Sequence, residues 1–128
     1  MNVAPGSFIQ VCRIAQIDQG QAQKNWIEIW QKTLQDTIGQ FIDQEDLDKQ
    51  EMQKLQNVFQ ELLEKQHKQE GLIDTIVSSL NRDRQQKFLQ ILSQKFADHL
   101  ETFNKNLKAK MTDEQRQEYT KFIKNKKL

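Results

Sequence analysis

Residues 88–107 read FLQILSQKFADHLETFNKNL and carry the clearest periodic pattern of the chain. Their apolar side chains recur every three or four positions, at Phe88, Leu92, Phe96, Leu100, Phe103 and Leu107. Because an α-helix completes a turn in about 3.6 residues, this spacing places them on one face of a helix. Neither proline nor glycine interrupts the stretch. It therefore predicts a long amphipathic helix.

The same period recurs in four further segments of the chain. They are residues 21–42, 47–63 and 72–80 and the segment from Thr112 onward. The only proline is Pro5, no glycine follows Gly71, and Gly71 is expected to end or bend the helix before it. The sequence therefore predicts an all-α fold, an antiparallel bundle of four to six helices in a single domain over residues 1–128.

The two ends of the chain differ from this pattern. Within residues 1–20, the apolar segment 8–17 fits either a short helix or an extended arm, and a helix is expected. Residues 112–128 are expected to form a short basic helix. Acid–base pairs four positions apart, such as Glu45/Lys49, support exposed helices.

Composition excludes several classes of protein. The chain has 128 residues, a formal charge of +1 and a single cysteine, so no intramolecular disulfide can staple it. No window approaches the ~18 uninterrupted apolar residues that a membrane-spanning helix needs. The N-terminal segment lacks the features of a secretory signal peptide. The expected location is therefore the cytoplasm if the chain is complete, and the periplasm if a signal peptide was removed.

The sequence offers few parts for an enzyme. Two histidines and Cys12 are the only candidates for a nucleophile and base pair outside the serines, and no catalytic motif surrounds them. No phosphate-binding glycine loop is present. We therefore expect no catalytic residues and no cofactor.

One spacing resembles a metal site, namely Glu64-x-x-His67-x-x-Glu70. A di-metal bundle needs a second such motif, but the residue three positions before His99 is Phe96. His67 is therefore expected to pair with a neighbouring glutamate, and no metal site is predicted.

Two tryptophans lie one helical turn apart, at Trp26 and Trp30. A core position is favoured over an interface for both, since large aromatic side chains dominate small cores. Ile27 and Ile29 widen this apolar face beyond what one bundle partner would cover, so residues 8–17, a second copy or another protein should cover it. Trp26, Ile27, Ile29 and Trp30 are the candidate partner-binding residues, with Ile29 expected to face outward.

A basic cluster closes the chain. Lys121, Lys124, Lys126 and Lys127 are a candidate phosphate-binding patch, although lysines also complement the dipole at the end of a helix. The overall charge is near zero, so nucleic acid is not the expected partner. It stays open as an alternative.

Residues 111–115 read MTDEQ, in which Thr112 and Gln115 have the spacing of a capping box. This segment resembles the LTxxQ motif of the Spy/CpxP-type periplasmic helical proteins, with Met111 in place of leucine. Residues 80–88 give a weaker second copy, with Asn81 and Arg84 in the threonine and glutamine positions. The resemblance implies a helical hairpin protein that acts as a chaperone or stress factor.

Elimination leaves a function in binding. We expect a non-enzymatic protein-binding helical bundle, such as an adaptor, an inhibitor or an assembly subunit. Its partner would be another protein or a second copy of the chain, giving a homodimer. The LTxxQ-like chaperone and the nucleic-acid binder are the alternatives.

Overall fold

The structure of the chain is a computed structural model that describes residues 4–64 and 71–126. These residues form helices and no strand, which confirms the all-α class. The helices in chain order are α1 (Gly6–Ile14), α2 (Gln19–Gln44), α3 (Lys49–Glu64), α4 (Leu72–Ser79), α5 (Arg82–Ala109) and α6 (Asp113–Lys126). The segment 8–17 therefore contains a helix, as expected, and not an extended arm.

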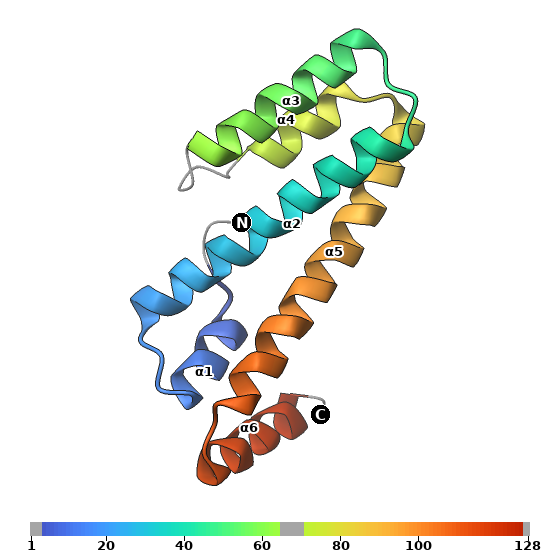
Figure 1. Cartoon of the computed structure of the whole chain (residues 1–128). Coiled ribbons are helices and arrows are strands. Elements are labelled where there is room, and N and C mark those ends of the chain that lie inside the picture. Colours follow the sequence, from blue (N-terminus) through green and yellow to red (C-terminus); the bar gives the residue numbers. More distant parts are fainter. Residues whose placement is uncertain (1–3, 65–70, 127–128) are drawn as a thin grey trace.

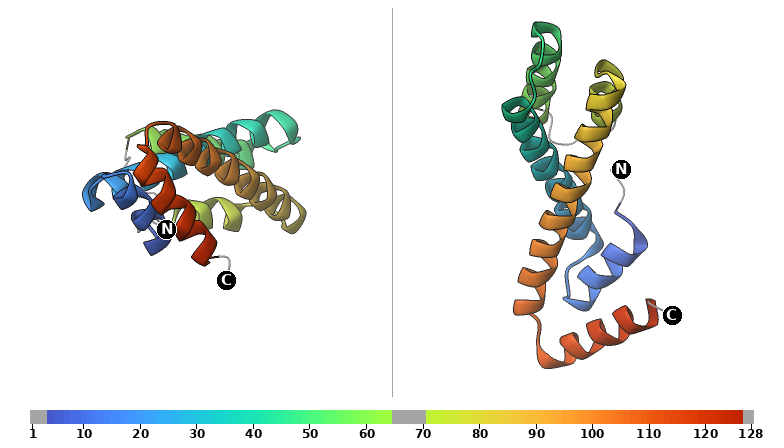
Figure 2. Two further views of the ribbon diagram at one scale, coloured as in Figure 1. Left: turned by 90° about the horizontal axis from the view of Figure 1, so that it is seen from below. Right: turned by 90° about the vertical axis from the view of Figure 1, so that its right-hand side faces the viewer.

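Helices α2 and α5 are the long elements of the fold, and they lie side by side and run in opposite directions (Figure 1). Helices α3 and α4 pack at one end of this pair, and α1 and α6 pack at the other. Figure 2 shows from two further sides that α6 crosses below the end of α5. We call these two regions the α3–α4 end and the α1–α6 end.

The core of the α3–α4 end is closed and mostly aliphatic. Its fully buried side chains include Leu34, Ile38, Phe41, Leu55, Leu62 and Phe88. Phe41 and Phe88 meet edge to face across α2 and α5, with their ring centroids 5.5 Å apart. Each such side chain contributes about 1.5–3 kcal/mol through burial, so this end holds much of the stability of the fold.

The core of the α1–α6 end is aromatic. Phe8 of α1 packs against Trp26 of α2 and Phe103 of α5, with centroid distances of 5.0 and 5.3 Å. A smaller cluster of Val11, Ile14, Leu107 and Met111 joins α1 to the turn before α6. Cys12 is fully buried here, and desolvation raises the pKa of its thiol to about 11.

Polar side chains fix where the helices begin. Asp18 and Asn81 accept hydrogen bonds from backbone amides at the starts of α2 and α5. Before α6, the amide of Thr112 donates to Gln115 Oε1 at 3.0 Å and the amide of Gln115 donates to Thr112 Oγ1 at 3.2 Å. The capping box expected from the sequence is therefore formed.

Gly71 directly precedes α4 with a φ of +82°, a left-handed conformation that favours glycine. It turns the chain into α4, where the sequence placed a break in the helical pattern. Residues 65–70 lie outside the described residues, and with them His67, Glu70 and the proposed neighbour pairing of that histidine.

Candidate functional site

The tryptophan face of α2 is covered from within the chain. Trp26 is 9 % exposed and Ile29 is 5 % exposed, because α1 and α5 pack on two sides of this part of α2. The expectation that Ile29 faces outward is therefore wrong. The sequence left open whether residues 8–17, a second copy or another protein would cover this face, and in the structure residues of α1 cover it.

Trp30 and Ile27 are only partly buried and so keep more exposure than Trp26 and Ile29. The ring of Trp30 stacks on Phe96 of α5, with the centroids 4.0 Å apart and the planes 19° apart. Trp26 and Trp30 therefore fill a core, the use that the sequence favoured. Trp26 and Ile29 present too little surface to bind a partner in this structure, which removes both from the candidate partner-binding set.

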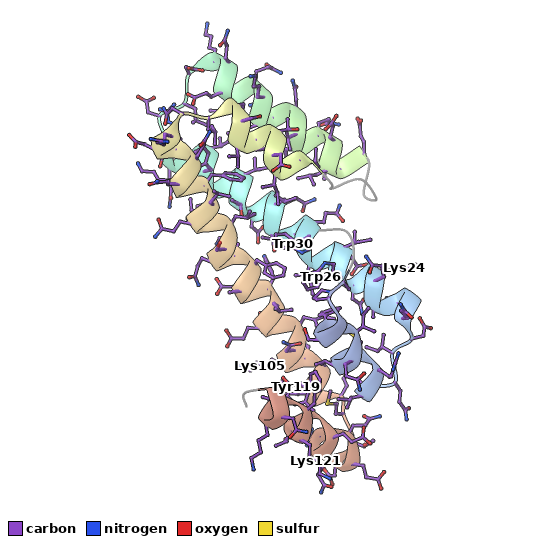
Figure 3. All side chains as sticks on the ribbon, turned by 180° about the vertical axis from the view of Figure 1, so that it is seen from behind. Lys24, Trp26, Trp30, Lys105, Tyr119 and Lys121 are labelled. Atoms are coloured by element: carbon purple, nitrogen blue, oxygen red, sulfur yellow. The ribbon has the colours of Figure 1, made fainter. Side chains whose placement is uncertain are left out.

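The described lysines of the basic cluster lie along α6. Lys121 and Lys124 are exposed there, and Lys126 belongs to the last turn of the helix, whereas Lys127 lies outside the described residues. Two lysines of α5 lie beside the same helix. Lys108 Nζ is 4.7 Å from the centroid of the Tyr119 ring, and Lys105 lies near Tyr119 as well (Figure 3).

A groove of about 500 Å³ runs between α5 and α6. It is lined by Ala97, Leu100, Glu101, Asn104, Lys105, Lys108 and Tyr119. An adjoining cavity of about 160 Å³ shares Leu100, Asn104 and Tyr119 with it and continues inward to Phe8, Trp26, Phe122 and Ile123. We call the two together the α5–α6 groove. Its floor is apolar and aromatic, and its rim carries two lysines and one glutamate.

A second groove, of about 400 Å³, lies between α2 and α3 at the other end of the molecule. Ile38, Gly39 and Ile42 of α2 and Phe59 of α3 form its apolar part, and Asp43, Gln56 and Gln60 form its rim. A Cβ atom added at Gly39 would meet nothing within 4 Å, so this glycine leaves open space. We call this the α2–α3 groove.

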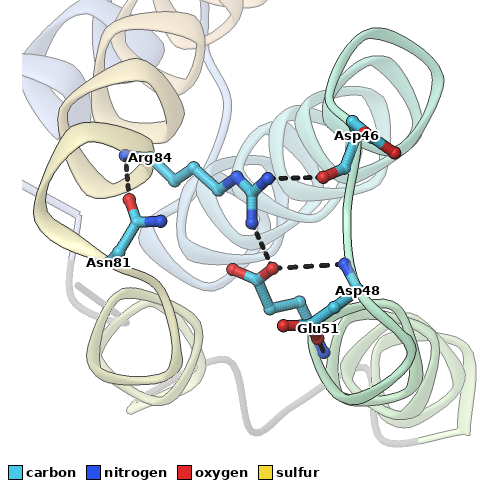
Figure 4. Close-up of polar contacts among 5 residues, drawn as sticks. All are labelled: Asp46, Asp48, Glu51, Asn81 and Arg84. Carbon is cyan, nitrogen blue, oxygen red and sulfur yellow. Dashed lines mark hydrogen bonds and ion pairs between the residues drawn. The ribbon is translucent and has the colours of Figure 1, made fainter.

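A polar cluster clamps the α3–α4 end (Figure 4). Arg84 at the start of α5 donates hydrogen bonds to the Glu51 carboxylate and to the carbonyl oxygen of Asp46. The bond to Glu51 raises the pKa of Arg84. Lys87 Nζ of α5 lies 3.4 Å from Glu45 Oε1, so Glu45 forms an ion pair with α5. This cluster is a structural clamp between the loop before α3 and α5.

His99 and Cys12 both take part in the packing of the described fold. His99 Nε2 lies 2.7 Å from Asp36 Oδ2 and thereby links α5 to α2. The Cys12 thiol stays protonated near neutral pH because burial raises its pKa to about 11. Among residues 4–64 and 71–126, no three His, Cys, Asp or Glu side chains come together as metal ligands would. Within the same described residues, no helix is long and apolar enough to cross a membrane.

Comparisons with protein-family models, with curated proteins and with solved structures give no match for this chain. The site must therefore be read from its own geometry. That geometry brings together Lys105 and Lys108 of α5 and Tyr119 of α6, which the sequence did not join. The sequence feature that could have indicated this contact is Lys108 near the end of one helix and the aromatic Tyr119 in the next helix.

Proposed function

We propose that the protein is a non-enzymatic binding module that holds another protein in the α5–α6 groove. The observation that carries the proposal is the groove itself, which has a volume of about 500 Å³, an apolar floor and a cationic rim. Such a groove suits an amphipathic helix, which lays its apolar face into the floor. Adaptors, inhibitors and assembly subunits all act in this way.

The floor offers anchoring positions of the kind that dominate binding energies. Tyr119 and Phe122 both line it and are partly exposed, and aromatic residues in partly desolvated pockets are enriched among binding hot spots. The Tyr119 ring is held in place by the Lys108 ammonium group above it. A partner side chain such as leucine or phenylalanine fits the space between Leu100 and the ring.

The rim favours an acidic partner. Lys105 and Lys108 face a single lining carboxylate, that of Glu101, so the groove has a net positive rim. Complementary charge accelerates encounter and disfavours basic partners. The partner is therefore an amphipathic helix with Asp or Glu beside its apolar stripe.

The test compares variants with matched controls as baits for proteins of the source organism. Ala97→Trp fills the groove from α5, and Ala109→Trp makes the same change at an exposed α5 position outside the groove lining. Lys105→Glu reverses a rim charge, and Lys24→Glu reverses an exposed charge on α2.

The proposed function predicts a protein that wild type and both controls retain and that both groove variants lose. Titration calorimetry with that purified protein should then show at least tenfold weaker binding to each groove variant. If every captured protein binds the groove variants as tightly as wild type, the proposed function is wrong.

The nucleic-acid alternative has one observation in its favour. Lys121 and Lys124 are exposed on α6, on the same end of the molecule as Lys105. Retention of mixed DNA or RNA that falls steeply with salt and is lost in Lys121→Glu/Lys124→Glu would favour it. The resemblance to LTxxQ proteins stays a prediction, since capping accounts for the contacts of Thr112 and Gln115.

A further inference from the structure

The two ends of the molecule carry opposite charge. At the α3–α4 end, residues 36–64 and 71–92 hold ten carboxylates against five Lys and Arg side chains. At the α1–α6 end, residues 4–35 and 93–126 hold eleven Lys and Arg side chains against seven carboxylates. Since α2 and α5 separate these ends along the long direction of the molecule (Figure 1), the described chain is an electric dipole.

The acidic end carries the α2–α3 groove. Ile42 and Phe59 are only partly buried there, and Asp43 stands at the rim. The surface continues past Asp43 to Asp36, with Lys95 as the one cation among the residues that line this extension. The acidic rim of the groove therefore suits a helix that carries exposed lysines.

Helix α6 at the basic end carries such lysines. Phe122 and Ile123 are partly buried against the rest of the chain, so the face that α6 offers to a neighbouring molecule is the exposed one with Lys121 and Lys124. α6 lies at the lower extremity of the molecule in the right-hand view of Figure 2, so a neighbouring molecule can approach it.

We propose that the protein associates with itself head to tail, the α2–α3 groove of one copy receiving the α6 end of a second copy. The charge complementarity of the two ends selects this occupant over an unrelated helix. The α2–α3 groove is distinct from the α5–α6 groove, and neither Lys121 nor Lys124 lines the α5–α6 groove. The inference therefore goes beyond the proposed function and does not require that groove to be filled.

Head-to-tail contact has a definite consequence for assembly. The two surfaces are different patches of the chain, so each added copy leaves one of each free. Association then gives rings or open chains whose mass rises with concentration. It also weakens with salt, because charges farther apart than the Debye length are screened from one another. That length is about 10 Å at 0.1 M salt and about 3 Å at 1 M.

The first measurement is sedimentation velocity of the full chain across a wide concentration range. In about 50 mM NaCl the mass should rise well above the 15.2 kDa monomer, and in about 1 M NaCl the monomer should dominate. A monomer at every concentration in low salt would overturn the proposal.

Two blocked variants then test the geometry. Gly39→Trp fills the α2–α3 groove, where a Cβ meets no atom within 4 Å, and Lys121→Glu/Lys124→Glu reverses the α6 charge. Each should weaken self-association at least tenfold. Gly39→Ala and Arg13→Glu/Lys24→Glu are the matched controls and should change it by less than about threefold, the range expected for exposed charges outside the contact.

Mixing the blocked variants decides between head-to-tail and symmetric contact. Each variant keeps the surface that the other has lost, so an equimolar mixture should form a dimer that grows no further. A mixture that stays monomeric overturns the proposal, as does unchanged association of Gly39→Trp. If Gly39→Trp fails to fold, Asp43→Lys replaces it, since Asp43 is exposed.

Failure of this proposal leaves the proposed function intact and separately testable. Ala97→Trp alters only the α5–α6 groove, so it should bind no partner yet associate with itself as wild type does. Gly39→Trp should show the reverse pattern.

Discussion

The α3–α4 end and the α1–α6 end share the same two long helices, yet they are closed in different ways. At the α3–α4 end, Phe41, Leu55 and Phe88 are fully buried, and Arg84 clamps the loop before α3. At the α1–α6 end, Tyr119 and Phe122 remain partly exposed beside a groove. The difference indicates that the α3–α4 end contributes more to the stability of the fold, whereas aromatic side chains of the α1–α6 end keep more exposure to solvent.

The strongest test of this comparison deletes one aromatic ring at each end. Phe88→Ala should lower the free energy of unfolding by about 3–5 kcal/mol, because a fully buried ring leaves a cavity. Phe122→Ala should cost about 1 kcal/mol, because that ring is only partly buried. Urea unfolding followed by circular dichroism measures both. Equal losses would show that the two ends contribute alike.

A second test asks whether the α1–α6 end opens on its own. At pH 8, Cys12 should react with a thiol reagent at least about a hundredfold more slowly than a free thiol, since burial raises its pKa from 9.0 to about 11. Yet it should react faster than a cysteine placed in the opposite core by Leu55→Cys in a Cys12→Ala background. Both positions are fully buried, but the cluster around Cys12 contains fewer buried side chains than the cluster around Leu55. The reverse order of rates would contradict the comparison.

The same pKa gives a pH dependence with a definite sign. The unfolded thiol ionises first as the pH rises, so the contribution of Cys12 to stability is complete below about pH 9 and is lost between pH 9 and 11. Wild type should therefore lose more stability than Cys12→Ala over that interval in parallel urea titrations. Equal losses would show that the Cys12 thiol is no more shielded than in the unfolded chain.

The sequence predicted what depends on neighbours in the chain. The period of Phe88 to Leu107 gave α5, and the side chains of Thr112 and Gln115 gave the start of α6. Whether Ile29 is buried depends on which helices flank α2, and a helical period does not contain that information. The meeting of Lys108 with Tyr119 depends likewise on the turn between α5 and α6, whose direction tertiary packing sets.

The smallest expected effect concerns the backbone turns at the two ends. Gln16 in the α1–α2 turn has a φ of +64°, whereas the other left-handed residue among those described, Gly71 before α4, is a glycine. A residue with a Cβ costs about 1 kcal/mol in that conformation. Gln16→Gly should therefore raise the free energy of unfolding by somewhat less than about 1 kcal/mol, since glycine also loses more entropy on folding.

Gly71→Ala should lower it by about 1 kcal/mol, because alanine brings the same penalty to a turn that now has none. Gln16→Ala is the control and should change little, as alanine and glutamine both carry a Cβ atom. Chemical denaturation of the three variants, in parallel with wild type, measures the differences. A gain from Gln16→Gly would show that removable backbone strain lies in the α1–α2 turn of the α1–α6 end. No gain would mean that the packing of Phe8 and Ile17 around the turn, and not the φ angle of Gln16, sets the stability there.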